Sequence, residues 1–234
     1  MIELILLFVL LLLTALARYL VFGVFEPLSF AMIFLFPVAA FAIFIISKRF
    51  ANKELSYQPK DIVGWSFYNI QKSLIIKKPL FEGNNQRGYI KRYFPKKWQY
   101  AFGDILGFNW YLCLEIQIDQ DTYDVRWYRE KWLTNQDQWK IYKNGKQIGG
   151  AHTLINLKNS SKLKEAIVFR FNDTECVSSA STMTSTISLS QNEELLGTLK
   201  RNHILSNVQI IDIQEQRLDY IVALIVHSYF FKNK

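Results

Sequence analysis

The first 47 residues are almost continuously apolar. From Ile2 to Phe22, and again from Ser29 to Ile46, nearly every position is hydrophobic, and the six residues between the two runs include Glu26 and Pro27. Each run is long enough to cross the roughly 30 Å hydrocarbon core of a bilayer as a helix. A connection this short places the two helices side by side and antiparallel. The pattern therefore predicts a transmembrane helical hairpin over residues 1–47, with spans at about 2–22 and 29–46.

After a polar connector over residues 48–62, the pattern changes to short runs rich in Val, Ile, Tyr, Phe and Trp, separated by Asn, Asp, Gly and Ser. This alternation predicts β-strands joined by turns and an all-β domain over residues 63–234. The most specific turn is Asn144-Gly145, which favours a two-residue hairpin, and Asn172 to Thr174 marks a weaker one. The predicted strands are Ser66–Ile76, Gly88–Phe94, Trp110–Ile118, Tyr123–Tyr128, Gln138–Tyr142, Gln147–Leu154, Ala166–Phe171, Cys176–Ala180, Thr184–Leu189, Leu195–Lys200 and Val208–Ile213.

One apolar run near the C-terminus does not fit the strand pattern. Residues Leu218 to Phe231 are hydrophobic on nearly every side, but they are too few to span a bilayer comfortably. Such an element must be enclosed by protein, and its length favours a helix over a strand. The sequence therefore predicts a mainly β fold, a β-barrel around a buried C-terminal helix, preceded by the two-helix transmembrane hairpin.

The charges beside the spans predict the orientation of the hairpin. Residues 1–47 contain only three charged side chains, whereas Lys48, Arg49 and Lys53 follow the second span directly. The positive-inside rule then places both termini in the cytoplasm. Within the hairpin, Arg18 can snorkel to the interface or pair with Glu26 across the turn.

A cleaved signal peptide is the alternative for the first apolar run, because Ala15-Leu16-Ala17 resembles a small-residue cleavage site. Signal peptides begin with basic residues, whereas this chain begins Met1-Ile2-Glu3. We therefore expect an uncleaved span and a multi-pass protein of the cell membrane with two spans.

Three segments carry a family resemblance. They are Trp139 to Gly149 around the Asn-Gly turn, Glu194 to Arg201 followed by Val208 to Asp212, and the closing segment that ends at Phe231. In these segments the chain resembles the bacterial tubby C-terminal-like domains, which are related to the LURP-one-related and phospholipid scramblase proteins. The resemblance covers residues 66–232 and implies a barrel of about twelve strands around a buried C-terminal helix. It also implies phosphoinositide binding through basic residues, but none of those residues aligns with a particular position here.

The densest positive charge lies between residues 72 and 97, where eight basic side chains accompany a single acid, Glu82. Aromatic side chains are interleaved with them, as on surfaces that contact lipid headgroups. The alternatives are a solvated basic face, or a nucleic-acid surface, which a membrane tether disfavours. The candidate lipid-binding residues are Lys77, Lys78, Arg87, Lys91, Arg92, Lys96 and Lys97.

The sequence contains no motif for catalysis, for a metal or for a cofactor. Asp119 to Glu130 has acids at three positions of a calcium loop, but Asp124 stands where that loop needs glycine, so we expect a polar turn. Cys113 and Cys176 are expected to be buried thiols, and His227 a hydrogen-bonded core residue. We therefore expect that the protein is not an enzyme and that it binds no cofactor.

Together these features predict an integral membrane protein whose cytoplasmic tubby-like domain binds or senses anionic phospholipid at the inner leaflet. The alternative is a membrane-localised protein-interaction module without catalytic activity, with an unidentified protein partner.

Overall fold

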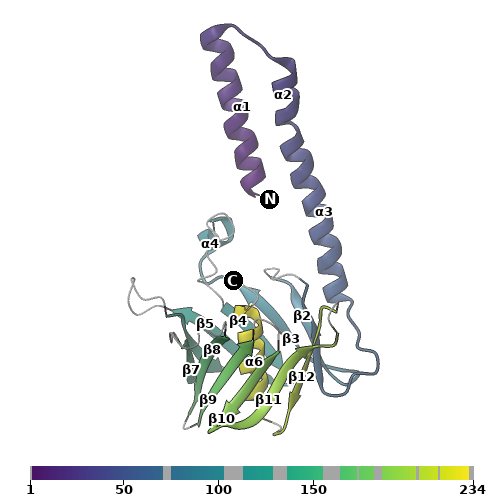
Figure 1. Cartoon of the computed structure of the whole chain (residues 1–234), viewed down its shortest axis with the longest axis vertical. Coiled ribbons are helices and arrows are strands. Elements are labelled where there is room, and N and C mark those ends of the chain that lie inside the picture. The colour runs from purple at the N-terminus through teal and green to yellow at the C-terminus, as the bar shows by residue number, and fades with distance from the viewer. Residues whose placement is uncertain are drawn as a thin grey trace.

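A computed structural model of the 234-residue chain describes residues 2–70, 75–102, 113–128, 136–154, 164–172, 174–181, 186–203, 206–215 and 217–231. An apolar helical hairpin projects from one end of a β-barrel, and the C-terminal helix lies inside that barrel (Figure 1). The predicted fold class is confirmed.

The hairpin consists of α1 (Ile2–Phe22), α2 (Pro27–Ile33) and α3 (Leu35–Leu55). Among the described residues, two stretches are long and apolar enough to cross a membrane, namely Glu3–Phe22 and Pro27–Leu55. Most of their large apolar side chains are exposed, as expected of helices whose surroundings are lipid.

Backbone chemistry sets the limits of these helices. Gly23 ends α1 in the left-handed conformation at φ 64°, which a residue without a Cβ adopts readily. Pro27 starts α2, where its missing N–H leaves no helical hydrogen bond unmade. The break at Phe34 lies within one turn of Pro37, which cannot donate to the carbonyl four residues earlier.

Helix α3 continues to Leu55, into the segment predicted as a connector. Ala51, Lys53, Glu54 and Leu55 all have good helix propensity, so nothing in this stretch ends the helix. The predicted domain limits of 1–47, 48–62 and 63–234 stay predictions.

Within the described residues, twelve antiparallel strands close into a barrel, in which each strand pairs with its neighbours in sequence and β1 pairs with β12. The strands are β1 (Trp65–Tyr68), β2 (Lys77–Glu82), β3 (Asn85–Tyr93), β4 (Cys113–Ile118), β5 (Asp121–Tyr128), β6 (Gln138–Lys143), β7 (Lys146–Thr153), β8 (Lys164–Phe171), β9 (Thr174–Ser181), β10 (Ile187–Gln191), β11 (Glu194–Arg201) and β12 (Val208–Ile213).

Strand β2 corrects the strand prediction. A single strand was predicted over Ser66–Ile76, whereas β1 ends at Tyr68 and a separate strand occupies Lys77–Glu82. Two initial lysines and Pro79 disfavour a strand in the sequence pattern. The strand forms because Leu80, which is fully buried, joins the barrel core.

Helix α6 (Leu218–Phe231) fills the barrel, and its side chains from Tyr220 to Phe230 are buried. The ring of Trp139 in β6 meets that of Phe230 edge to face, with 5.3 Å between the ring centroids. In β7, Gly149 allows a close strand approach, because a Cβ at this position would overlap the carbonyl oxygen of Arg170. The predicted buried C-terminal helix is confirmed.

The two ends of the barrel are built differently. The connections after β2, β4, β6, β8 and β10 are two residues long, and the predicted hairpins at Asn144-Gly145 and after β8 are both present. Asn144 and Gly145 have φ values of 50° and 80°, as a type I′ turn requires. The connections after the odd-numbered strands are longer, and one of them contains α4 (Lys97–Phe102).

Because successive connections of an up-and-down barrel alternate between its ends, the short turns share one end and the longer connections share the other. The end with the longer connections meets α3, since Ile70, just after β1, donates its N–H to Glu54 of α3 at 2.7 Å. We call this the helix-side end and the opposite one the far end. The C-terminus of α6 and α4 both lie at the helix-side end (Figure 1).

Candidate functional site

A buried polar cluster joins α3 to the barrel at the helix-side end. The Glu54 carboxylate accepts hydrogen bonds from the Ile70 N–H at 2.7 Å and from the Lys78 ammonium at 3.0 Å. Lys78 also donates to Asn69 Oδ1 at 2.8 Å, and its Nζ lies 5.5 Å from the ring centroid of Tyr229 in α6. The side chains of Glu54 and Lys78 are 0% and 1% exposed. The cluster therefore connects α3, the barrel wall and the core helix.

The buried ion pair of Glu54 and Lys78 makes this junction specific. Burial lowers the pKa of the Lys78 ammonium, and the carboxylate of Glu54 opposes that shift. Desolvation largely offsets the attraction between buried charges, but removing one partner leaves the other uncompensated and costs about 3–5 kcal/mol. α3 is therefore held at this position on the barrel, and the helix-side end faces the hairpin.

The structure divides the seven predicted lipid-binding residues into three groups. Two are buried, two are paired on the barrel wall and three are exposed; in that order they are Lys78 and Arg92, Arg87 and Lys91, and Lys77, Lys96 and Lys97. Lys77 starts β2 at the helix-side end, but its ammonium lies on the wall, 4.3 Å from the ring centroid of Tyr89. The Arg92 guanidinium lies 5.4 Å from the ring centroid of Phe94. The seven side chains therefore do not share one face.

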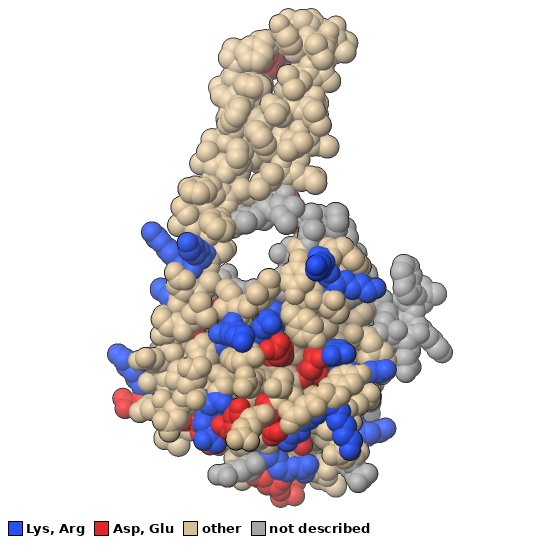
Figure 2. Space-filling model, turned by 180° about the vertical axis from the view of Figure 1, so that it is seen from behind, with Lys and Arg blue, Asp and Glu red and all other residues tan. Residues whose placement is uncertain are grey.

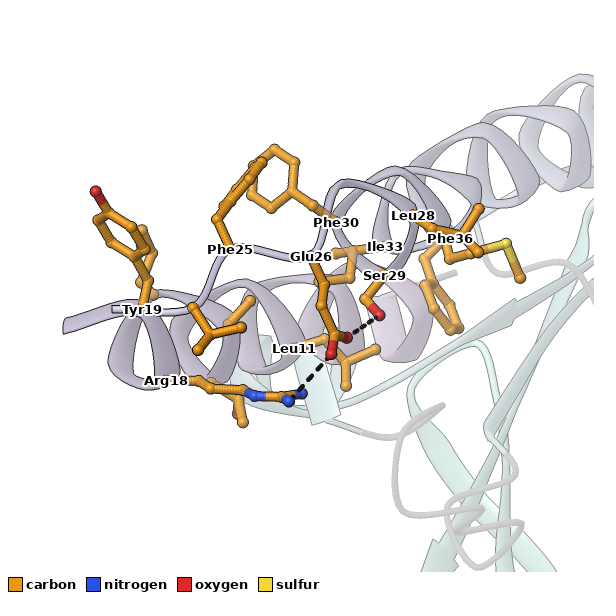
Figure 3. A pocket seen from close by; sticks show the side chains of 15 residues that line it. Leu11, Arg18, Tyr19, Phe25, Glu26, Leu28, Ser29, Phe30, Ile33 and Phe36 are labelled. Atoms are coloured by element: carbon orange, nitrogen blue, oxygen red, sulfur yellow. Dashed lines mark hydrogen bonds and ion pairs between the residues drawn. The ribbon is translucent and has the colours of Figure 1, made fainter. Parts of the chain in front are cut away.

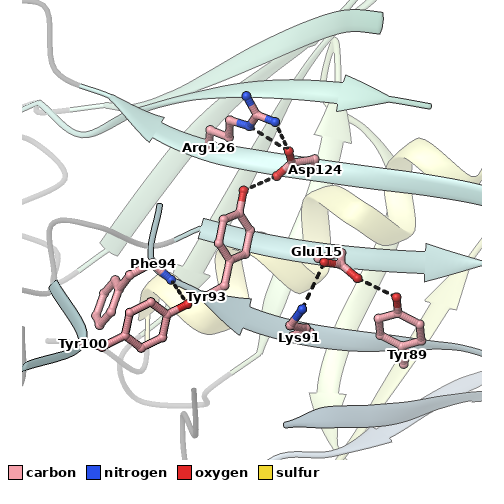
Figure 4. Close-up of polar contacts among 8 residues, drawn as sticks. All are labelled: Tyr89, Lys91, Tyr93, Phe94, Tyr100, Glu115, Asp124 and Arg126. Carbon is pink, nitrogen blue, oxygen red and sulfur yellow. Dashed lines mark hydrogen bonds and ion pairs between the residues drawn. The ribbon is translucent and has the colours of Figure 1, made fainter. Parts of the chain in front are cut away.

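On the wall formed by β3, β4 and β5, carboxylates from neighbouring strands accompany the basic side chains (Figure 4). The Lys91 ammonium lies 3.4 Å from Glu115, which also accepts a 2.5 Å hydrogen bond from the Tyr89 hydroxyl. That hydrogen bond raises the pKa of Tyr89 to about 12. Arg87, nearer the far end, contacts Asp119 at 2.9 Å.

A second set of contacts on this wall repeats the arrangement. The Tyr93 hydroxyl donates to Asp124 at 2.5 Å, and Arg126 Nε donates to the other oxygen of the same carboxylate at 2.7 Å (Figure 4). Burial and the hydrogen bond to Asp124 both raise the pKa of Tyr93. The wall is locally balanced in charge, so its basic residues do not form an anion-binding surface of their own.

Positive charge instead collects at the helix-side end. Lys96 and Lys97 are exposed there, Lys77 starts β2 at the same end, and Lys48 and Arg49 are exposed on the adjoining part of α3. Figure 2 shows basic side chains around the junction of hairpin and barrel, whereas acidic and basic side chains are mixed lower on the barrel.

Among the described residues, the charges of the connections differ in the same direction. The described connections at the helix-side end contain Lys96, Lys97 and Asp137, a net charge of +1. Those at the far end, with the described residues between β12 and α6, have a net charge of −2, from Asp119, Glu193, Glu215 and Arg217. The described connections at the helix-side end are therefore the more positive ones.

Sequence reasoning missed three residues of this end. Glu54 lay in a polar connector and was not singled out, and Ile75 was placed inside a strand, whereas it is 61% exposed after β1. Trp98 was counted only as one of several interleaved aromatic residues, and it is 48% exposed in α4. The available signal was an apolar residue close to lysines in the sequence, since Ile75 precedes Lys77 by two positions and Trp98 follows Lys97.

The hairpin contains a cleft of about 920 Å³ between α1, the turn and α2, lined mainly by apolar side chains (Figure 3). Its polar groups are joined to one another. The Arg18 guanidinium donates to Glu26 at 3.1 Å, and the Ser29 hydroxyl donates to the second oxygen of the same carboxylate at 2.8 Å. The predicted pairing of Arg18 with Glu26 is confirmed.

No metal centre is formed by the described part of the chain, in which no three His, Cys, Asp or Glu side chains are grouped as ligands. Asp119 and Gln120 form the short turn between β4 and β5, which confirms the predicted polar turn. Glu130, the last position of the calcium-like pattern, lies outside the described residues.

Three further reactive side chains are buried. Cys113 and Cys176 are buried as predicted, and burial raises their pKa values to about 11 and about 12. Cys113 pairs across strands with Tyr93 and therefore faces the outer side of the wall, whereas Cys176 belongs to the core. His227 is a buried core residue, also as predicted, with its Nδ1 2.6 Å from the Ser178 hydroxyl.

A family model described as the Tubby C-terminal like domain matches residues 68–232. The chain belongs to this family. The match runs from the end of β1 through α6 and therefore covers the barrel but not the hairpin. Tubby-like domains are generally non-catalytic, and the family as a whole points to phospholipid binding. No curated protein and no solved structure matches the chain.

Proposed function

We propose that the chain is a two-span integral membrane protein whose tubby-like barrel binds anionic phospholipid of the cytoplasmic leaflet through its helix-side end. The observation that carries this proposal is the group of exposed basic side chains where α3 meets the barrel, namely Lys48 and Arg49 of α3, Lys77 at the start of β2, and Lys96 and Lys97 beside α4. This end of the barrel is the one to which the second span is attached.

The attachment brings this end close to the leaflet. The apolar part of the span ends near Ser47, and Glu54 enters the barrel seven residues later. At 1.5 Å per residue, that separation is about 10 Å along the helix. Charges on the helix-side end then lie within about one Debye length of an anionic surface, where each basic group contributes about 1 kcal/mol.

Hydrogen–deuterium exchange of the full chain in lipid nanodiscs tests the proposal. We expect the described segments 75–77 and 94–102 to exchange more slowly in discs with anionic lipid than in zwitterionic discs, and this difference to disappear at high salt. The triple variant Lys77→Glu, Lys96→Glu, Lys97→Glu should lose the difference as well.

A matched variant carries the same change of charge elsewhere. Lys60→Glu, Lys146→Glu and Arg170→Glu alter three exposed basic residues away from the helix-side end and should keep the lipid-dependent protection. If anionic lipid leaves the helix-side segments unchanged, or if both triple variants behave alike, the proposal is wrong.

The second candidate function is a protein-interaction module, which the wall of β3 to β5 favours. Tyrosine and arginine are enriched in protein interfaces, and Tyr89, Tyr93 and Arg126 lie on this wall in charge-balanced pairs. Crosslinking of the full chain in membranes would favour this function if one partner were retrieved in stoichiometric yield, independently of anionic lipid.

A further inference from the structure

We propose that the helix-side end inserts two apolar side chains, Ile75 and Trp98, into the interfacial layer of the bilayer. This inference rests on the proposed function and specifies how the barrel engages the leaflet. The observations that carry it are the conformation of Ile75, the presentation of Trp98 by α4, and the lysines beside both.

Ile75 adopts an unfavourable backbone conformation while its side chain is exposed. Its φ is 73°, which is strained for a β-branched residue, and its side chain is 61% exposed. Its N–H donates to the Arg92 carbonyl at 2.9 Å, which fixes the backbone at the end of β3. Neither side-chain burial nor backbone preference explains an isoleucine here, and strain of this kind is typical of functional positions.

Trp98 is presented by an element that the barrel holds in place. The buried Gln99 side chain accepts a hydrogen bond from the Lys96 N–H at 3.0 Å, and the Tyr100 hydroxyl accepts one from the Phe94 N–H at 3.0 Å. These contacts fix α4 from the barrel side, while Trp98 remains 48% exposed. Figure 1 shows α4 rising from the barrel toward the N-terminus of α1, where the first span begins.

The occupant that fits this surface is the bilayer itself. Tryptophan is enriched at membrane interfaces, and the exposed Lys77, Lys96 and Lys97 beside the two apolar side chains suit anionic headgroups. Leu195, at the start of β11 near the far end, is 42% exposed, but the nearest turn there carries Glu193 instead of lysines. Leu195 therefore provides a control of similar exposure in the opposite electrostatic setting.

Site-specific fluorescence quenching of the full chain in nanodiscs with anionic lipid tests insertion. The variants Ile75→Cys, Trp98→Cys and Leu195→Cys are each labelled with an environment-sensitive dye, and the unaltered chain with its buried Cys113 and Cys176 serves as the labelling blank. One set of discs carries a nitroxide on the lipid headgroup, and a second set carries it on the upper acyl chain.

We expect the acyl-chain nitroxide to quench the dye at positions 75 and 98 and to leave position 195 unquenched. Quenching by the headgroup nitroxide alone would overturn insertion while leaving the proposed leaflet contact intact. If neither nitroxide quenches the dye at positions 75 and 98, both insertion and the proposed leaflet contact are wrong.

A variant without a dye provides an independent measurement. Ile75→Gly removes both the apolar side chain and the backbone strain, so the barrel should melt at a higher temperature. The same variant should lose part of the protection from exchange that anionic discs give to residues 94–102. An unchanged or lower melting temperature, together with full protection, would overturn the role assigned to Ile75.

Discussion

At the scale of single residues, the most unusual side chain inside the barrel is His227. It lies on α6 with Nδ1 2.6 Å from the Ser178 hydroxyl of β9. Burial lowers the pKa of His227 to about 3, so the imidazole is neutral in the folded chain at physiological pH. A charged imidazole in this core would lack the hydration that stabilises it in water. Folding is therefore linked to the protonation of this residue.

This linkage predicts a stability difference in acid. The unfolded chain binds a proton near pH 6.5 and the folded chain only near pH 3, so stability is full above 6.5 and falls as the pH decreases toward 3. The slope from this residue reaches at most about 1.4 kcal/mol per pH unit. Chemical unfolding measured across this range should show a shallower slope for His227→Gln than for the unaltered chain.

His203 offers the matched control, because it is an exposed histidine in the connection after β11. His203→Gln should follow the acid dependence of the unaltered chain. Equal slopes for His227→Gln and His203→Gln would contradict the assignment.

Residue-level roles could be predicted from the sequence only where one chemistry dominates. The buried thiols, the core histidine and the Asn144-Gly145 turn follow from composition and turn preference. The burial of Lys78 could not be predicted, because the groups that receive it come from distant parts of the chain. Lys78 is enclosed by Glu54, 24 positions earlier, and by Tyr229 at the end of α6.

At the scale of elements, the same limit explains which strands and helices were missed. β2 carries two lysines and a proline, and it becomes a strand because β1 and β3 pair with it on both sides. α6 was predicted because an apolar run of 14 residues is a strong local signal. α4, with only six residues, gives no hydrophobic period that a sequence reading can detect.

The joint between α3 and the barrel predicts a characteristic set of mutant stabilities. Glu54→Gln or Lys78→Met leaves one buried charge without its partner, and each should destabilise the barrel by about 3–5 kcal/mol. The double variant Glu54→Leu, Lys78→Met removes both charges and should recover a large part of that loss. Unfolding of the full chain in detergent, followed by circular dichroism, measures all of these variants.

Arg87 and Asp119 provide a comparison on the surface, because their 2.9 Å ion pair is largely exposed. Arg87→Met should change stability by no more than about 1 kcal/mol. If Glu54→Gln were as mild as Arg87→Met, the ion pair in the junction would not be what holds α3 to the barrel.

At the scale of the whole molecule, the orientation of the hairpin in the membrane decides which leaflet the barrel faces. Three basic residues follow the second span, whereas the turn between the spans carries Glu26 paired with Arg18. In the proposed orientation, the exposed basic side chains where α3 meets the barrel face the cytoplasmic leaflet, whose anionic lipids attract them. The opposite topology would place the same side chains against a leaflet that offers less negative charge.

Thiol accessibility in intact cells distinguishes these two topologies. Val24→Cys places a thiol at an exposed position in the turn between the spans, and Lys97→Cys places one at the helix-side end of the barrel. A membrane-impermeant maleimide should label Val24→Cys in intact cells and label Lys97→Cys only after permeabilisation, because the positive-inside rule puts the barrel in the cytoplasm. The mass of the labelled chain also tests cleavage after Ala17, since cleavage would remove most of α1 and leave the turn at the new N-terminus. Labelling of Lys97→Cys in intact cells would exclude the cytoplasmic leaflet as the lipid surface, and the proposed function would fail with it.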